Sequence, residues 1–91
     1  MPENILIITI SDDAMAPRAN VGDRAEINVA ALPKNNSIVY VELNGAPTIR
    51  RITREGNAYR LTADNPIKYP DIITEKPHVL GVVENVQYDV F

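Results

Sequence analysis

Seven prolines divide this chain into segments that are too short for a long helix. They are spread over the whole sequence, at Pro2, Pro17, Pro33, Pro47, Pro66, Pro70 and Pro77. The widest gap, between Pro47 and Pro66, already contains a further break at Gly56-Asn57. Because proline has no backbone N–H and interrupts helices, this spacing predicts a mainly β chain of short antiparallel strands and hairpins, with little or no helix.

Hydrophobic patterning places the first strands between these breaks. Residues 5–10 form an almost continuous apolar run, which predicts a buried strand. Ala25, Ile27 and Val29 alternate with polar residues, which predicts a half-exposed strand. Residues 37–43 and 48–53 flank Asn44-Gly45, a dipeptide that tolerates the positive φ values of a type I′ turn, so they predict a hairpin.

The second half of the chain continues this pattern. Glu55-Gly56-Asn57 turns the chain into a further strand over residues 58–62. Residues 63–77 are rich in proline, which predicts a surface loop. A last strand is expected over residues 79–83, and the alternation of apolar and polar residues continues it as far as Val90.

The composition describes one small domain, residues 1–91, that is stabilised by packing alone. The absence of cysteine excludes disulfides, thiolate metal sites and cysteine nucleophiles. Nine Lys and Arg against twelve Asp and Glu give a net charge of −3, which disfavours a free-standing nucleic-acid binder. The longest apolar stretch, residues 5–8, is far shorter than the ~20 residues of a membrane span. The N-terminus has no basic flank for a signal peptide, so we expect a cytoplasmic protein with no membrane partner.

The usual signatures of catalysis and cofactor binding are missing. The single histidine, His78, has no Ser or Cys motif to pair with, so we expect a solvent-exposed or capping role and not a catalytic one. The four glycines are isolated, and no spacing of His or carboxylates resembles a metal site, so no cofactor is expected. Asp12 and Asp13 are interpreted as solvated turn residues, because adjacent side chains on an extended chain point to opposite sides. The basic cluster Arg50-Arg51-Ile52-Thr53-Arg54, with Arg60 beyond it, is expected to be solvated or in local ion pairs.

Three groups of residues follow one another in a distinctive order. The first is Asp13-Ala14-Met15-Ala16-Pro17 with Val21-Gly22-Asp23. The second is residues 36–41, the Asn44-Gly45 turn and Thr48-Ile49-Arg50-Arg51-Ile52. The third is Leu61, Asn65-Pro66, Tyr69-Pro70 and Leu80-Gly81-Val82-Val83. Together, over about residues 5–90, they resemble the C-terminal domain of the LexA, UmuD and phage CI repressor family, a β-fold that carries a Ser-Lys self-cleaving peptidase site.

The resemblance places Ala14 at the position of the family's serine and Arg50 at the position of its lysine. Alanine has no nucleophile. Arginine, with a pKa above ~12, cannot become the neutral base that would take a serine proton. Ser11 lies three residues upstream of the serine position, and the lysines Lys34, Lys68 and Lys76 lie outside the strand that would carry the base, so no relocated dyad is visible. If Arg50 points where a buried lysine would, it needs a carbonyl or a carboxylate partner, for which Asp12, Asp13 and Glu42 are the candidates.

The resemblance therefore implies a non-catalytic oligomerisation domain of a phage-type CI transcriptional repressor. We expect the chain to be part of a longer protein that contacts DNA through an N-terminal helix-turn-helix domain, and to form homodimers or higher oligomers. Two alternatives stay open. One is an inactivated, serine-to-alanine version of a self-cleaving LexA-like or UmuD-like serine peptidase. The other is a stand-alone module that binds a partner protein or peptide in the vestigial cleft.

The C-terminal segment is the expected dimer interface. Val86, Tyr88, Val90 and Phe91 place several large apolar groups within six residues of a small acidic domain. A terminal strand with an apolar face and free backbone groups is commonly covered by a second copy across a two-fold axis. The alternative is that these residues complete the core of the monomer.

Overall fold

In the computed structural model, residues 4–65 and 67–88 are described. They form seven strands: β1 (Ile5–Thr9), β2 (Arg24–Asn28), β3 (Ile38–Leu43), β4 (Ala46–Glu55), β5 (Ala58–Thr62), β6 (Ile72–Thr74) and β7 (His78–Gln87). No helix occurs in these residues, and so they contain no helix that is long and apolar enough to span a membrane. The mainly β fold expected from the prolines is confirmed.

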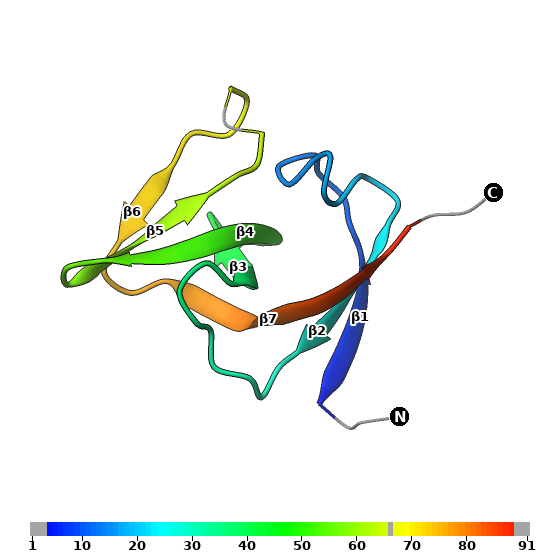
Figure 1. The fold of residues 1–91 in the computed structure, drawn as a ribbon, viewed down its shortest axis with the longest axis horizontal. Coiled ribbons are helices and arrows are strands. Elements are labelled where there is room, and N and C mark those ends of the chain that lie inside the picture. Colours follow the sequence, from blue (N-terminus) through cyan, green and yellow to red (C-terminus); the bar gives the residue numbers. More distant parts are fainter. Residues whose placement is uncertain (1–3, 66, 89–91) are drawn as a thin grey trace.

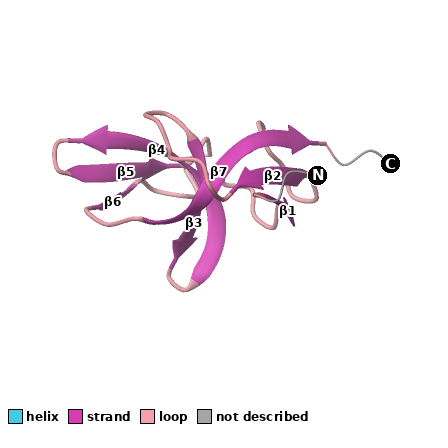
Figure 2. Cartoon of the chain, turned by 90° about the horizontal axis from the view of Figure 1, so that it is seen from below, coloured by secondary structure: helices cyan, strands magenta, loops and turns pink. Residues whose placement is uncertain are grey.

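All seven strands belong to one antiparallel sheet with the order β1-β2-β7-β3-β4-β5-β6. The long strand β7 pairs with β2 along its C-terminal half and with β3 along its N-terminal half. Figure 2 shows β1 and β2 at one end of the molecule and β4, β5 and β6 at the other, with β7 running between them. The sheet is strongly curled (Figure 1). Its buried side chains form two separate apolar cores.

Strand β3 divides its side chains between the two cores. Ile38 and Tyr40 pack against the first core, whose buried residues are Ile10, Met15, Ala19, Ala25, Ile27 and Ile49. Val39 and Val41 belong to the second core, with Ile52 and Leu61. Because successive side chains on a strand point to opposite faces, a strand with apolar residues on both faces can serve two cores at once.

The turns follow the sequence closely. Asn44 and Gly45 both have positive φ, 52° and 81°, as a type I′ turn requires, and they join β3 to β4. Gly56, with φ of 59°, lies in the turn between β4 and β5. These two turns set the register of the β3-β4-β5 meander, and both predictions are confirmed.

Two predictions about burial and length are wrong. Residues 5–10 are not a buried strand throughout, because β1 lies at the edge of the sheet with β2 as its single partner strand. The side chains of Leu6 and Ile7 are therefore about half exposed. Residues 63–77 are not entirely a surface loop, because Ile72–Thr74 form β6 against β5 and Ala63 is buried. The three prolines in residues 63–77 predict a loop, and β6 is too short to give a clear strand pattern between them.

Candidate functional site

The loop between β1 and β2 carries Ala14 and is fixed by hydrogen bonds at its ends and in its middle. The N–H of Ile10 donates to the carbonyl of Asp23 over 2.8 Å, which joins the two ends. Ala14 donates its N–H to Asp12 Oδ1 (3.1 Å) and accepts at its carbonyl from the N–H of Asn65 (2.9 Å). The side chain of Ala14 has no exposed surface. The loop thus holds position 14 in the interior.

Arg50 lies in β4 and is buried, with 8% of its surface exposed. One of its terminal nitrogens donates to Thr48 Oγ1 and to the carbonyl of Ile49, both over 2.8 Å. The same nitrogen lies 3.8 Å from Asp12 Oδ2, and the guanidinium carbon lies 5.0 Å from the centre of the Tyr69 ring. A buried charge requires such partners. The expectation of a carbonyl or carboxylate partner is therefore confirmed, with Asp12 as the carboxylate.

Asp12 connects the loop to the strand. Its Oδ1 accepts from the N–H of Ala14, and its Oδ2 accepts from the hydroxyl of Thr48 over 2.6 Å. Thr48 in turn accepts from Arg50, so a chain of hydrogen bonds runs from position 50 to position 14. Asp12 is half-buried and has several partners, so its interpretation as a solvated turn residue is wrong. In the sequence, Thr48 belongs to a motif segment but is assigned no role, although its place two residues before Arg50 puts both on one face of the strand.

Asp13 turns away from Asp12 and faces the loop between β5 and β6. It accepts from the hydroxyl of Tyr69 over 2.7 Å, and the ammonium of Lys68 lies 3.3 Å away. The hydrogen bond from Tyr69 lowers the pKa of Asp13 below its ordinary value of 3.8, and Lys68 adds to this effect. The carboxylate in turn raises the pKa of Tyr69 above 10.0. Asp13 is therefore bonded to two residues of the neighbouring loop, while its side chain stays 38% exposed, so the expectation of a solvated residue holds in part for Asp13.

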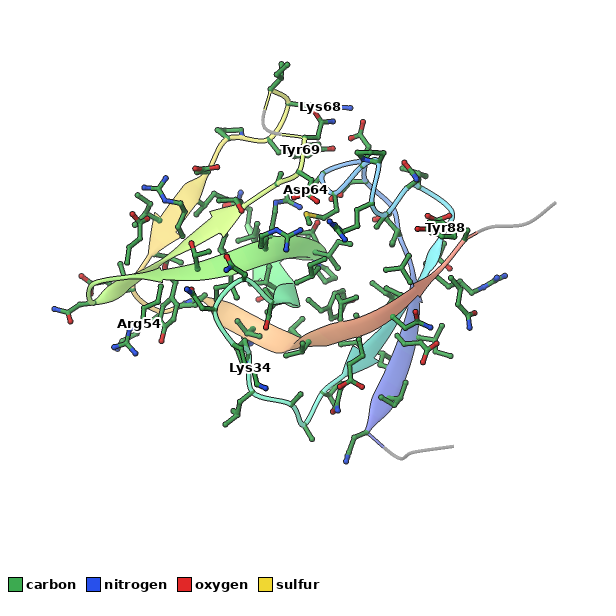
Figure 3. The ribbon with its side chains drawn as sticks, in the orientation of Figure 1. Lys34, Arg54, Asp64, Lys68, Tyr69 and Tyr88 are labelled. Carbon is green, nitrogen blue, oxygen red and sulfur yellow. The ribbon has the colours of Figure 1, made fainter. Side chains whose placement is uncertain are left out.

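Asp64 ties the same two loops to β4. Its carboxylate lies 3.2 Å from Arg51 and 3.3 Å from Arg18. Figure 3 shows Asp64, Lys68 and Tyr69 on the loop between β5 and β6, at the same end of the molecule as the loop between β1 and β2. Arg50 and Arg51 thus point to different partners, as expected of neighbours on a strand.

A small groove of about 180 Å³ borders this cluster. It is lined by Ile8, Thr9, Ile10, Ser11, Asp12, Tyr40, Pro47, Thr48 and Ile49. Its polar wall is the Asp12–Thr48 hydrogen bond, and its apolar wall comes from β1 and β4. Within the described part of the chain, no three His, Asp or Glu side chains are grouped so as to hold a metal ion.

The remaining polar residues singled out in the sequence lie outside this cluster. Glu42 pairs with His78 over 3.1 Å, and both side chains are largely exposed, as expected for His78. Arg60 forms ion pairs with Glu55 and with Asp71, which raise its pKa. The expectation of local ion pairs is confirmed for Arg51 and Arg60.

The expected dimer interface is only partly described. Val86 packs against the first core, and Tyr88 is 63% exposed. Val90 and Phe91 lie outside the described residues. The register of β7 with β3 ends at Val82, whereas its register with β2 continues to Gln87. Within the described ranges, the last residues of β7 are therefore paired along one side only.

The comparisons with known proteins agree with this architecture. The family model described as Peptidase S24-like matches residues 1–84. The chain therefore belongs to the Peptidase S24-like family, which contains the C-terminal domains of LexA, UmuD and CI. The comparison with curated proteins found no match.

Proposed function

We propose that this domain is a non-catalytic oligomerisation module of a phage-type CI transcriptional repressor. It acts in the cytoplasm and forms homodimers or higher oligomers. It supports cooperative binding to an operator by a helix-turn-helix domain elsewhere in the same protein. The observation that carries the proposal is the identity of two side chains, Ala14 and Arg50, at the positions that the motif resemblance assigns to the family's serine and lysine.

The surroundings of Ala14 support the loss of catalysis. Its methyl group offers no nucleophile, and its side chain is fully buried. Both of its backbone polar groups are already bonded, to Asp12 and to Asn65. Loss of the nucleophile from a unit of catalytic residues costs on the order of 10⁶ in rate.

The surroundings of Arg50 point the same way. A general base has to accept a proton, and a guanidinium with a pKa above ~12 stays charged at any physiological pH. Arg50 donates hydrogen bonds to Thr48 and Ile49 and lies near the carboxylate of Asp12, so its guanidinium serves here as a hydrogen-bond donor. An inactivated version of a functional peptidase would differ from its parent at position 14 alone, which leaves Arg50 unexplained.

Self-association is supported by the end of β7. Tyr88 exposes a large aromatic ring next to backbone groups with no strand on one side in the described ranges. An exposed apolar side chain beside a strand with one open edge is a typical dimerisation surface. Binding of a partner peptide in the groove beside Asp12 is the second candidate, favoured by the apolar wall of that groove.

A cleavage assay tests the catalytic part of this proposal. The domain is incubated at alkaline pH with a peptide that contains the family's Ala-Gly cleavage site, and fragments are followed by mass spectrometry. We expect no cleavage by the wild type or by Ala14→Ser, because Arg50 cannot act as the base. The double variant Ala14→Ser, Arg50→Lys is the control, in which any trace of activity should first appear. Turnover by the wild type, or robust cleavage by Ala14→Ser alone, would contradict the proposal.

A further inference from the structure

A second and larger groove, of about 500 Å³, lies away from Ala14. It is lined by Leu32, Pro33, Lys34, Asn35, Ile52, Thr53, Arg54, Tyr59, Pro77 and Val79. These residues come from the loop between β2 and β3, from β4 and β5, and from the start of β7. It shares no residue with the groove beside Asp12. A volume of this size is typical of a ligand or peptide site.

The floor of this groove is apolar. Ile52 belongs to the second core, and Tyr59 and Val79 pack against that core while remaining partly exposed. At the rim, Leu32 is 87% exposed. A large apolar side chain beside an apolar floor is a surface that gains free energy when a partner covers it.

Two cations, Lys34 and Arg54, border the apolar floor. In the described part of the chain, no carboxylate lies within 4.0 Å of either side chain, whereas Arg18, Arg51 and Arg60 all have one. Arg54 donates instead to the carbonyl of Gly56. Figure 3 shows Lys34 and Arg54 on the side of the molecule opposite to Lys68 and Tyr69. In an acidic domain, these two charges favour an anionic group at this groove.

The backbone at this groove is also suited to an extended chain. β4 continues past the start of β3, so that Ile52 is bonded to residues 36 and 37 of the preceding loop. Two residues further, the N–H of Arg54 donates to the side-chain carbonyl of Asn35 over 2.9 Å. Asn35 thus occupies the position that the backbone carbonyl of a neighbouring strand would take. A peptide carbonyl could replace it without leaving the N–H unsatisfied.

We propose that this groove binds a short extended segment of a partner protein in which an Asp or Glu lies next to a large apolar residue. The apolar side chain packs on Ile52, Val79 and Leu32, and the carboxylate lies between Lys34 and Arg54. A nucleic acid fits less well, because two cations on a domain with a net charge of −3 neutralise few phosphates. This binding does not depend on the oligomerisation proposed above.

The experiment selects short random peptides displayed on phage against the intact chain and then measures the enriched sequences as synthetic peptides by calorimetry. We expect the enriched peptides to carry an acidic residue within two positions of a large apolar one. Arg54→Glu should weaken their binding by about tenfold or more, because a charge-assisted contact becomes a repulsion. The control Arg24→Glu changes the net charge equally at an exposed cation that lies outside the groove.

The outcomes are distinct. Enrichment of acidic and apolar peptides, together with a loss specific to Arg54→Glu and Leu32→Ser, supports the proposal. No enrichment, no acidic preference, or equal weakening by Arg54→Glu and Arg24→Glu overturns it. Binding of a single-stranded oligonucleotide that depends on Arg54 more strongly than peptide binding does would also overturn it, in favour of a nucleic-acid site.

Discussion

Arg50 is a permanent charge in a buried part of β4, and its partners explain how the fold accommodates it. The guanidinium uses a hydroxyl, a carbonyl, a carboxylate and an aromatic face, each from a residue close in space. The need for such partners could be predicted from the sequence, because a guanidinium cannot lose its charge. The identity of Tyr69 as the aromatic face could not be predicted, since eighteen residues of chain lie between the two positions.

The bond between Tyr69 and Asp13 should make stability depend on pH at both extremes. The pKa of Asp13 is lowered, so its contribution is present above 3.8 and is lost as pH falls through the folded-state pKa. The pKa of Tyr69 is raised, so its contribution is present below 10.0 and is lost as pH rises through the folded-state pKa. Tyr69→Phe should therefore lower the Tm at neutral pH, and the difference from wild type should shrink at both extremes.

Thermal unfolding followed by circular dichroism across this pH range provides the measurement. Tyr59→Phe is the matched control, because its hydroxyl has no hydrogen-bond partner among the described residues, so its difference from wild type should stay constant with pH. A Tm difference for Tyr69→Phe that does not change with pH would show that the Asp13 bond contributes nothing.

At the scale of the elements, β7 depends on a close contact with β2. A Cβ at Gly81 would lie 2.5 Å from Ile27 Cγ2, 3.0 Å from the carbonyl oxygen of Asn28 and 3.2 Å from Val29 Cα. Ile27 is a fully buried core residue that cannot move away freely. Gly81→Ala should therefore destabilise the fold by about 1–3 kcal/mol, as overpacking does.

Urea denaturation measures this cost, and a second background tests its cause. In an Ile27→Ala background the nearest clashing atom is gone, so Gly81→Ala should cost less there than in the wild type. An equal cost in both backgrounds would assign the effect to the backbone of β2, and no cost at all would contradict the close packing of the two strands.

The elements that could be predicted from the sequence are those with a local signal. Asn44-Gly45 and Gly56 mark turns through their own backbone conformations, so the β3-β4-β5 meander was predictable from short segments. The edge position of β1 and the existence of β6 depend on which strands become neighbours in space. Their apolar runs carry no information on which strands become neighbours. The sequence therefore predicts a buried Leu6 and a loop at Ile72, whereas Leu6 is half exposed and Ile72 lies in β6.

The same distinction applies to the candidate site. The resemblance to the family predicts from the sequence that positions 14 and 50 belong to one site. The carboxylate that joins them, Asp12, was only one of three candidates, because a contact between a loop and a distant strand has no local signature. The structure selects it through Thr48, which bonds Asp12 and Arg50 at once.

At the scale of the whole molecule, two surfaces are left open by the described residues 4–65 and 67–88. One is the end of β7 with Tyr88, and the other is the groove of about 500 Å³ with Lys34 and Arg54. They lie on different elements, so self-association and binding of a partner segment can occur on the same domain.

Sedimentation velocity across a range of concentrations tests self-association most directly. The wild type should shift from monomer to dimer at a protein concentration of about 10 µM or lower, which corresponds to a weak but specific affinity. Tyr88→Glu should stay a folded monomer, because burial of an unpaired charge at the interface costs more than the contact gains. Ile67→Glu, at a loop position that is 98% exposed, is the control and should dimerise like the wild type. A wild type that stays monomeric throughout, or a Tyr88→Glu variant that dimerises unchanged or unfolds, would contradict the account.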